Sequence, residues 1–219
     1  MYESKRKKIN DMYLHDVYQE CLKECFSLIN IIPSPSEEYI DIFFDCYYKI
    51  SSVYISLGEM GRAIKYLKLA LKYVGTNKDK LKDELESNKA NRARANWLLS
   101  YYYMNMSSKK AIKHIQKAID DYAFINDDEN LYGALVHKGY LMRNTTLITD
   151  SIKVLKHLNI HTARMNEIYA DLIKCYVAQG DYIKAQHAIL NISDKKKRFL
   201  WYDYINCAIN ERGYVYEKV

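Results

Sequence analysis

Apolar side chains recur at spacings of three and four residues through most of the chain, a pattern that predicts amphipathic helices. Between residues 45 and 74 two such faces follow each other, separated by Gly58. The first face contains Tyr47, Ile50, Ser51 and Tyr54, and the second contains Ala63, Ile64, Leu67, Ala70 and Leu71. Gly75 stands where a helix C-cap needs a residue that tolerates a left-handed backbone. The stretch is therefore predicted to be two helices joined by a tight turn.

This helix pair resembles a tetratricopeptide repeat (TPR), a helix–turn–helix unit of about 34 residues. Residues 44–77 match the eight signature positions of that family with Tyr47, Ile50, Ser51, Tyr54, Gly58, Ala63, Leu67 and Ala70. Tyr47 replaces the usual Trp, Ser51 replaces Gly, and Gly75 replaces the closing Pro. The resemblance implies an all-α, right-handed solenoid in which each repeat buries its apolar face on the next.

Three further stretches match the same eight positions, at successive offsets of 48, 40 and 34 residues. The second repeat has Ala95, Leu98, Leu99, Tyr102, Met106, Ala111, Ile115 and Ala118. The third has Leu135, Lys138, Gly139, Met142, Thr146, Ser151, Leu155 and Leu158. The fourth has Tyr169, Leu172, Ile173, Tyr176, Gly180, Ala185, Ile189 and Ile192. The chain is thus predicted to contain about four TPR-like repeats.

We expect residues 1–219 to form a single repeat domain. Its parts are an N-terminal cap or degenerate repeat over 1–33, repeats over 35–75, 78–125, 128–159 and 162–193, and a capping helix over 194–213. Residues 9–32 are predicted to be one long helix.

Local signals place the helix starts. Ser34 to Glu37 form a capping box that predicts a helix start near residue 35. The charged stretch 78–96 lacks Gly and Pro, so it is predicted to extend the next helix. Ser107 or Ser108, and then Asp194, are predicted N-caps.

Composition supports a helical, folded chain and limits the classes of partner that we expect. Seven Gly and two Pro in 219 residues favour helices, and 49% hydrophobic content excludes a disordered chain. The net charge of +6 is modest, and the basic runs Lys5–Lys8 and Lys195–Arg198 are interpreted as solvated helix ends, so nucleic acid is not an expected partner. No apolar run approaches the ~18 residues of a membrane span, and no signal peptide is recognised, so we expect a cytoplasmic protein without membrane contact.

The sequence contains no catalytic constellation, so neither an enzyme nor a cofactor is expected. It has no phosphate-binding glycine loop, no G-x-S-x-G and no H-E-x-x-H. Cys21 and Cys25 lie one turn apart and are interpreted as core residues. His157 and His161 could share a metal, but Asn159 between them predicts a helix end, so no metal site is expected.

The unequal repeat offsets resemble the bacterial peptide-receptor branch of the TPR superfamily, which includes quorum-sensing regulators and the arbitrium receptors of temperate phages. This resemblance implies a concave groove lined by polar positions of the first helix of each repeat. Those positions are Tyr48, Lys49, Ser52, Asn96, Ser100, Tyr103, His137, Tyr140, Arg143, Asn144, Asp171 and Lys174. Amides can pair with a peptide backbone, cations with a carboxylate, and tyrosines supply rigid contact area.

Two functional hypotheses follow from these patterns. The first is a cytosolic regulator that binds a short peptide or the tail of a partner protein in the groove, and so shifts its own conformational population. The second is a constitutive scaffold that docks a folded protein or forms a homodimer, through Phe199, Trp201 and Tyr202 of the last helix. Since about 30 residues precede the first clear repeat and contain no recognisable DNA-reading motif, we expect action without DNA or a sensor part of a longer regulator.

Overall fold

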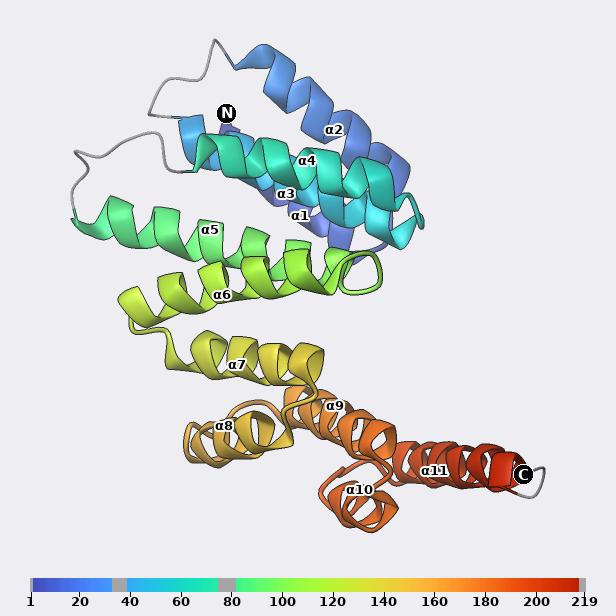
Figure 1. Ribbon diagram of the computed structural model, residues 1–219. Coiled ribbons are helices and arrows are strands. Elements are labelled where there is room, and N and C mark those ends of the chain that lie inside the picture. Colours follow the sequence, from blue (N-terminus) through green and yellow to red (C-terminus); the bar gives the residue numbers. More distant parts are fainter. Residues whose placement is uncertain (1, 33–38, 75–81, 217–219) are drawn as a thin grey trace. The chain divides into compact units, whose positions relative to one another are not determined.

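The computed structural model describes residues 2–32, 39–74 and 82–216, and within these ranges the regular structure consists of eleven α-helices (Figure 1). The predicted all-α fold class is confirmed. The chain divides into two compact units, residues 1–125 and 126–219, each of which we describe by itself. A single domain over 1–219 remains a prediction.

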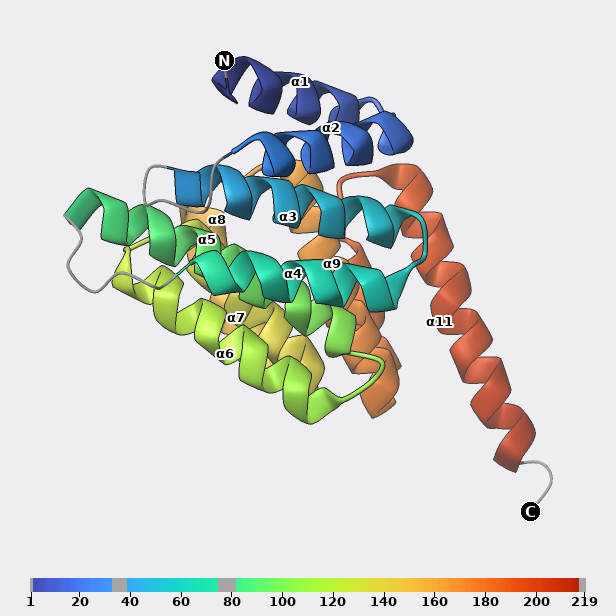
Figure 2. The same cartoon turned by 90° about the horizontal axis from the view of Figure 1, so that it is seen from above.

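Unit 1 consists of three helical hairpins. Its helices are α1 (Tyr2–Leu14), α2 (Tyr18–Ile31), α3 (Ile40–Ser56), α4 (Met60–Tyr73), α5 (Lys82–Tyr103) and α6 (Ser108–Phe124). The hairpins are α1–α2, α3–α4 and α5–α6, and α2 also packs on α3 and α4 on α5 (Figures 1 and 2). Each hairpin therefore covers an apolar face of its neighbour, as a repeat array requires.

Unit 2 consists of two hairpins and a final helix. Its helices are α7 (Asp128–Met142), α8 (Thr145–His157), α9 (Thr162–Gln179), α10 (Tyr182–Ile189) and α11 (Lys195–Tyr216). Both α7 and α8 contact α9, and α11 contacts α10 and α9. The core includes Leu155, Ile173, Ile189 and Ile205, all fully buried. Helix α11 covers the last hairpin, in the place where a capping helix is predicted, and it continues to Tyr216.

The prediction of one long helix over residues 9–32 is wrong. The chain forms the hairpin α1–α2 there, in the region predicted as a cap or degenerate repeat, and four further hairpins follow it. The helix ends because Asp16 adopts a left-handed backbone with φ 59°, and the Val17 amide donates to the Met12 carbonyl at 2.9 Å. Such a reverse bond closes a helix C-terminus, and Asp is one of the few residues that tolerate this conformation.

The N-cap predicted at Ser107 or Ser108 lies at Ser107, whose side chain accepts a bond from the Lys110 amide. The side chains of Asp127, Asn144 and Asp181, which were not predicted to be N-caps, each accept a bond from a backbone amide three residues further on. Asp194 caps α11 through bonds from the Lys196 and Lys197 amides. The charged stretch is helical from Lys82, as predicted. The capping box at 34–37 and the C-cap at Gly75 lie outside the described residues, and α3 begins at Ile40.

The predicted register of α5 is wrong by one residue. In repeat one Tyr54 stacks on Tyr66 at 5.5 Å and 13°, and in the next repeat Tyr103 stacks on His114 at 5.5 Å and 12°. Tyr103 therefore occupies the position assigned to Tyr102, and likewise Ser100 takes the fully buried place of Ser51. The chain advances six residues from the stacked Tyr54 to the first residue of α4 but five from Tyr103 to the first residue of α6, and this difference rotates the face of α5.

The predicted register of α8 is also wrong, by three residues. Because α8 begins directly after Arg143 and Asn144, the position of Ala63 in repeat one belongs to Ile148 and not to Ser151. Gly139 faces it closely: a Cβ on Gly139 would lie 2.7 Å from Ile148 Cγ1 and 3.1 Å from the Asn144 carbonyl oxygen. Only glycine permits this approach of α7 to α8.

A row of nearly parallel aromatic rings joins α3 to α4. Phe43 stacks on Tyr73 at 5.2 Å, Tyr73 on Tyr47 at 5.6 Å, Tyr47 on Tyr66 at 6.2 Å, and Tyr66 on Tyr54 at 5.5 Å. The angles between neighbouring planes are 13° to 21°. Offset stacking of this kind stabilises an interface beyond the area it buries.

Candidate functional site

A groove runs between α9 and α11 in unit 2. One part has a volume of about 530 Å³ and is lined by Asn166, Glu167, Ala170, Lys174, Ile192, Lys197, Leu200, Trp201 and Tyr204. A second part of about 310 Å³ is lined by Val177, Ala178, Tyr204, Cys207, Ala208 and Glu211. Both parts lie between α9 and α11 and share Tyr204 as a lining residue, and we call them together the α9–α11 groove.

The two walls of this groove are helical faces. On α9 the lining residues extend from Asn166 to Ala178, and on α11 from Lys197 to Glu211. Twelve residues of helix correspond to a length of about 18 Å. The groove is therefore long enough for several residues of a bound polypeptide.

Apolar side chains on the α11 wall are unusually accessible. Leu200 is 68% exposed and Tyr204 43% exposed. Trp201 is half-buried and meets the Tyr204 ring edge-to-face at 5.4 Å and 88°. An exposed apolar patch at a cavity marks a binding surface more often than a lone exposed leucine does.

Lys174 places a positive charge inside the groove. Its ammonium group lies 3.2 Å from the Asp171 carboxylate, 5.8 Å from the centre of the Trp201 ring and 5.6 Å from that of Tyr140. Burial raises the pKa of Asp171, and the neighbouring Lys174 opposes part of that rise. Ring faces attract cations, so Lys174 is held above Trp201 at the base of the wall.

Near the start of α11, side-chain hydrogen bonds hold the connection between α10 and α11 in place. Asn166, which is 8% exposed, donates to the Ser193 hydroxyl at 3.0 Å and accepts from the Ser193 amide at 3.0 Å. The Arg198 guanidinium donates to the Ile192 carbonyl. These bonds hold the 190–194 connection, and so hold α11 at a defined distance from α9.

The structure brings three of the predicted groove residues together in unit 2. Tyr140, Asp171 and Lys174 form the cluster just described, and Lys174 also lines the cavity. Arg143 and Asn144 lie in the exposed turn between α7 and α8, where Arg143 has φ 52° and Asn144 caps α8. These two residues therefore have a role in the turn and do not line the cavity.

Four predicted residues are buried in helix packing. Asn96, Ser100, Tyr103 and His137 have exposed fractions of 2%, 0%, 6% and 1%. For the first three the cause is the shifted register of α5, which turns them toward α6. Asn96 contacts His114 Nδ1 at 2.9 Å. Burial lowers the pKa of His137 to about 4, so this imidazole is neutral near pH 7.

The three predicted residues of α3 are half-buried in unit 1. Tyr48 stacks on Phe44 at 5.7 Å, and the Ser52 hydroxyl donates to the Tyr48 carbonyl at 3.1 Å. The Lys49 ammonium lies 4.3 Å from the centre of the Tyr13 ring of α1. Since α1 forms a hairpin with α2, it covers part of the α3 face that was expected to be open.

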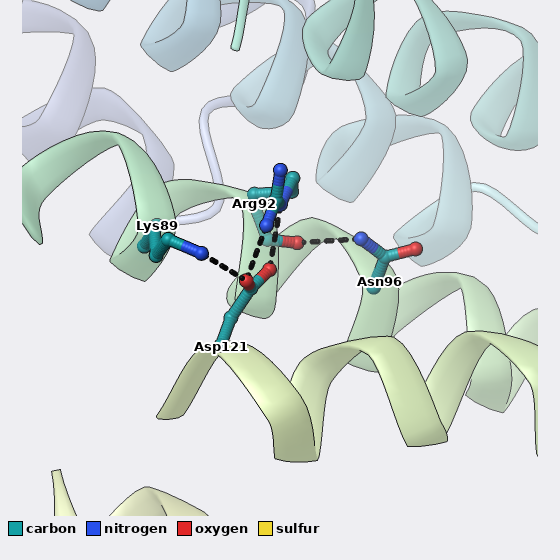
Figure 3. A network of polar contacts seen from close by, with 4 residues as sticks. All are labelled: Lys89, Arg92, Asn96 and Asp121. Atoms are coloured by element: carbon teal, nitrogen blue, oxygen red, sulfur yellow. Dashed lines mark hydrogen bonds and ion pairs between the residues drawn. The ribbon is translucent and has the colours of Figure 1, made fainter. Parts of the chain in front are cut away.

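Unit 1 contains a polar network around the buried Asp121, between α5 and α6 (Figure 3). Asp121, which is 2% exposed, accepts from Arg92 Nε at 2.7 Å and also from Arg92 Nη2, and Lys89 Nζ lies 3.5 Å from its carboxylate. Asn96 Nδ2 donates to the Arg92 carbonyl at 2.9 Å. The network ties α5 to α6 and leaves the carboxylate with almost no solvent access.

The described residues contain neither a cluster of metal ligands nor a membrane-spanning helix. Among them no group of three or more His, Cys, Asp and Glu side chains is arranged to hold a metal ion. None of the helices in the described ranges is long and apolar enough to cross a membrane.

The fold is that of TPR-like repeat proteins. A putative kinesin light chain with nearly identical TPR-like repeats from Podosopora anserina superposes with a TM-score of 0.58 at 13% identity, covering 87% of this chain and 92% of that one. A variant of the same protein gives 0.59, with the same identity and coverage. BtubC (BKLC) from P. vanneervenii gives 0.60 at 17% identity, covering 94% and 77%. No protein-family model and no curated protein sequence matches the chain.

Several groove residues were missed from sequence because α11 was assigned to capping and to protein docking through Phe199, Trp201 and Tyr202. Lys197, Leu200, Tyr204, Ala208 and Glu211 recur at spacings of three and four on one face of α11. These residues lie beside the buried Ile205 on α11. Their spacing in the sequence therefore predicts a second face of this helix.

Proposed function

We propose that this protein is a non-catalytic interaction module that binds a short peptide, or the tail of a partner protein, in the α9–α11 groove. The observation that carries the proposal is the accessible apolar wall of Leu200 and Tyr204 along the cavity between α9 and α11. The TPR-like fold supports it, because neighbouring helices separated by a groove leave room for an added segment.

The lining indicates which peptide would fit. Leu200, Trp201 and Tyr204 with Ala170 form an apolar pocket for one large side chain, which would supply most of the binding energy. Lys174 and Lys197 line the same cavity and suit a carboxylate beside that anchor. The proposed ligand is therefore an extended segment with a bulky apolar residue next to an acidic residue or a free C-terminus.

The test selects ligands from a displayed library of random dodecapeptides on the full chain and measures the enriched peptides by fluorescence anisotropy. Leu200→Asp and Phe199→Asp are a matched pair. Both residues are highly exposed, at 68% and 72%, but Leu200 lines the cavity and Phe199 does not. A Trp97→Phe background leaves Trp201 as the fluorophore that reports on occupation of the groove.

We expect Leu200→Asp to weaken peptide binding at least tenfold, which corresponds to about 1.4 kcal/mol. Phe199→Asp should bind like the wild type, and Trp201 emission should change on saturation. Equal loss in both variants, or binding without any change in Trp201 emission, would place the peptide elsewhere.

Self-association is a second candidate function, favoured by the exposure of Phe199. Phe199 does not line the groove, while Trp201 and Tyr202 are half-buried against the unit 2 core. If α11 mediates a homodimer, light scattering after gel filtration should give twice the monomer mass, and Phe199→Asp should restore the monomer. A monomer at all concentrations would refute this candidate and leave peptide binding untouched.

A further inference from the structure

Two neighbouring helices of unit 1 carry an unusual concentration of lysine. Helix α4 has Lys65, Lys68 and Lys72 at spacings of three and four, and α6 has Lys110, Lys113 and Lys117 at the same spacings. All six are exposed. Each set extends over about 10 Å of helix. We call these six residues the lysine face.

This face carries little compensating negative charge. Met60–Tyr73 contains no acidic residue, and in α6 the acidic residues are confined to Asp120 and Asp121 near the C-terminal end. Within the described part of the chain, none of the six lysines forms an ion pair with a carboxylate. Elsewhere in the chain several exposed lysines do so, as Lys153 does with Asp150 and Lys184 with Asp181.

The two sets of lysines converge on one aromatic ring. Lys68 Nζ of α4 lies 5.9 Å from the centre of the Tyr103 ring, and Lys110 Nζ of α6 lies 5.4 Å from it. His114 stacks on the same ring, and its pKa is lowered to about 4 by burial and then by Lys117, Lys68 and Lys113. The lysines of both helices therefore contribute to one positive field.

A cavity of about 410 Å³ lies between these helices, beside α5. It is lined by Leu71, Arg92, Asn96, His114, Lys117, Asp120 and Asp121. Leu71 supplies an apolar part of its wall, and Lys117 belongs both to this lining and to the lysine face. The lysine face thus adjoins a hollow that can receive part of a chain segment.

We propose that the lysine face is a second interaction surface, which docks an acidic polypeptide segment of a partner protein between α4 and α6. Carboxylates spaced like the lysines would pair with both rows at once. This surface lies on unit 1 and is independent of the peptide groove of unit 2.

Two observations favour acidic protein over nucleic acid. Tyr103 is 6% exposed and already stacked, so it offers no free ring face for a base. Arg92, whose planar group suits phosphate, is already bonded to Asp121.

The test uses a fluorescein-labelled 16-residue peptide with Glu at every third or fourth position, and a 20-base-pair DNA duplex as the competing probe. Anisotropy is measured with the full chain at 50 mM and 300 mM NaCl. One variant carries Lys65→Gln, Lys68→Gln and Lys72→Gln. Its control carries Lys7→Gln, Lys23→Gln and Lys196→Gln, which neutralises three exposed lysines outside the face.

Each exposed ion pair contributes a factor of about 1.4 to 5 in affinity, so removing three should weaken peptide binding about 3- to 100-fold. The control variant should bind like the wild type, and binding should weaken at the higher salt concentration. Equal weakening in both variants would show that binding depends only on the net charge of the protein, and it would overturn the proposal. Absence of peptide binding, or tighter binding of the duplex through the same lysines, would also overturn it.

Discussion

Asp121→Asn should destabilise unit 1 measurably. The replacement keeps the shape of the side chain but removes its charge, and it places an amide donor against the donors of Arg92. Since Asp121 is 2% exposed, water has almost no access to replace the lost interactions of the carboxylate. Asp120 offers a matched control, because it is exposed and accepts one bond from Gln116 at 2.8 Å.

The expected magnitude follows from the bonds that are lost. Hydrogen bonds to charged groups contribute about 1.5–3 kcal/mol each, and Asp121 accepts two from Arg92. The Arg92 side chain is 40% exposed, so its guanidinium regains water when the carboxylate is neutralised, which offsets part of the loss. We expect Asp121→Asn to lower the free energy of unfolding by about 2–3 kcal/mol, and Asp120→Asn by less than about 0.5 kcal/mol.

The assay is urea unfolding followed by tryptophan fluorescence in a Trp201→Phe background. Trp97 is then the remaining fluorophore, and it meets Tyr122 edge-to-face at 5.9 Å, next to Asp121 in the chain. The signal therefore reports on unit 1. If the two Asn variants unfold at the same urea concentration, the buried ion pair makes no net contribution, and the reasoning is refuted.

Three further predictions concern the contact of α7 with α8, the turn between them and a buried histidine. Gly139→Ala should lower the melting temperature, because overpacking against Ile148 costs about 1–3 kcal/mol and exceeds the helix-propensity gain of about 1 kcal/mol. Arg143→Gly should raise the melting temperature, because glycine adopts the left-handed φ of 52° without the strain of about 1 kcal/mol that arginine has there. An unchanged melting temperature would contradict this. The pKa of His137 in the fold is about 4, below its unfolded value of about 6.5, so protonation favours unfolding. Stability measured in urea should therefore fall by up to about 3 kcal/mol as the pH is lowered from 6.5 to 4. His137→Gln should make this decrease smaller, and part of it should remain because the pKa of His114 is also lowered in the fold.

Helix positions could be predicted from sequence, because apolar periodicity and N-cap residues are local signals. The register of α5 could not. Leu98 and Leu99, and likewise Tyr102 and Tyr103, are adjacent pairs of similar residues, so the pattern fits equally well one residue earlier or later. The number of residues between the stacked tyrosine and the start of the next helix decides between the two, and periodicity carries no information about that number.

The break between α1 and α2 could not be predicted from the sequence pattern either. Helix ends are usually marked by Gly or Pro, whereas here Asp16 takes the left-handed conformation. The candidate site was predicted in part: Lys174, Asp171 and Tyr140 do come together, but the α11 wall was not anticipated. A groove depends on the distance between two helices, and that distance is set by contacts such as Asn166 with Ser193, 27 residues apart.

The row of rings between α3 and α4 gives this protein an optical property of its own. Five aromatic rings in near-parallel contact couple their electronic transitions, so in a Trp97→Phe background unit 1 should still show near-ultraviolet circular dichroism from tyrosine and phenylalanine. The coupling decays steeply with separation, and it would vanish if α4 moved away from α3 by a few ångströms. The protein thus carries an intrinsic, label-free reporter of the packing within its first clear repeat.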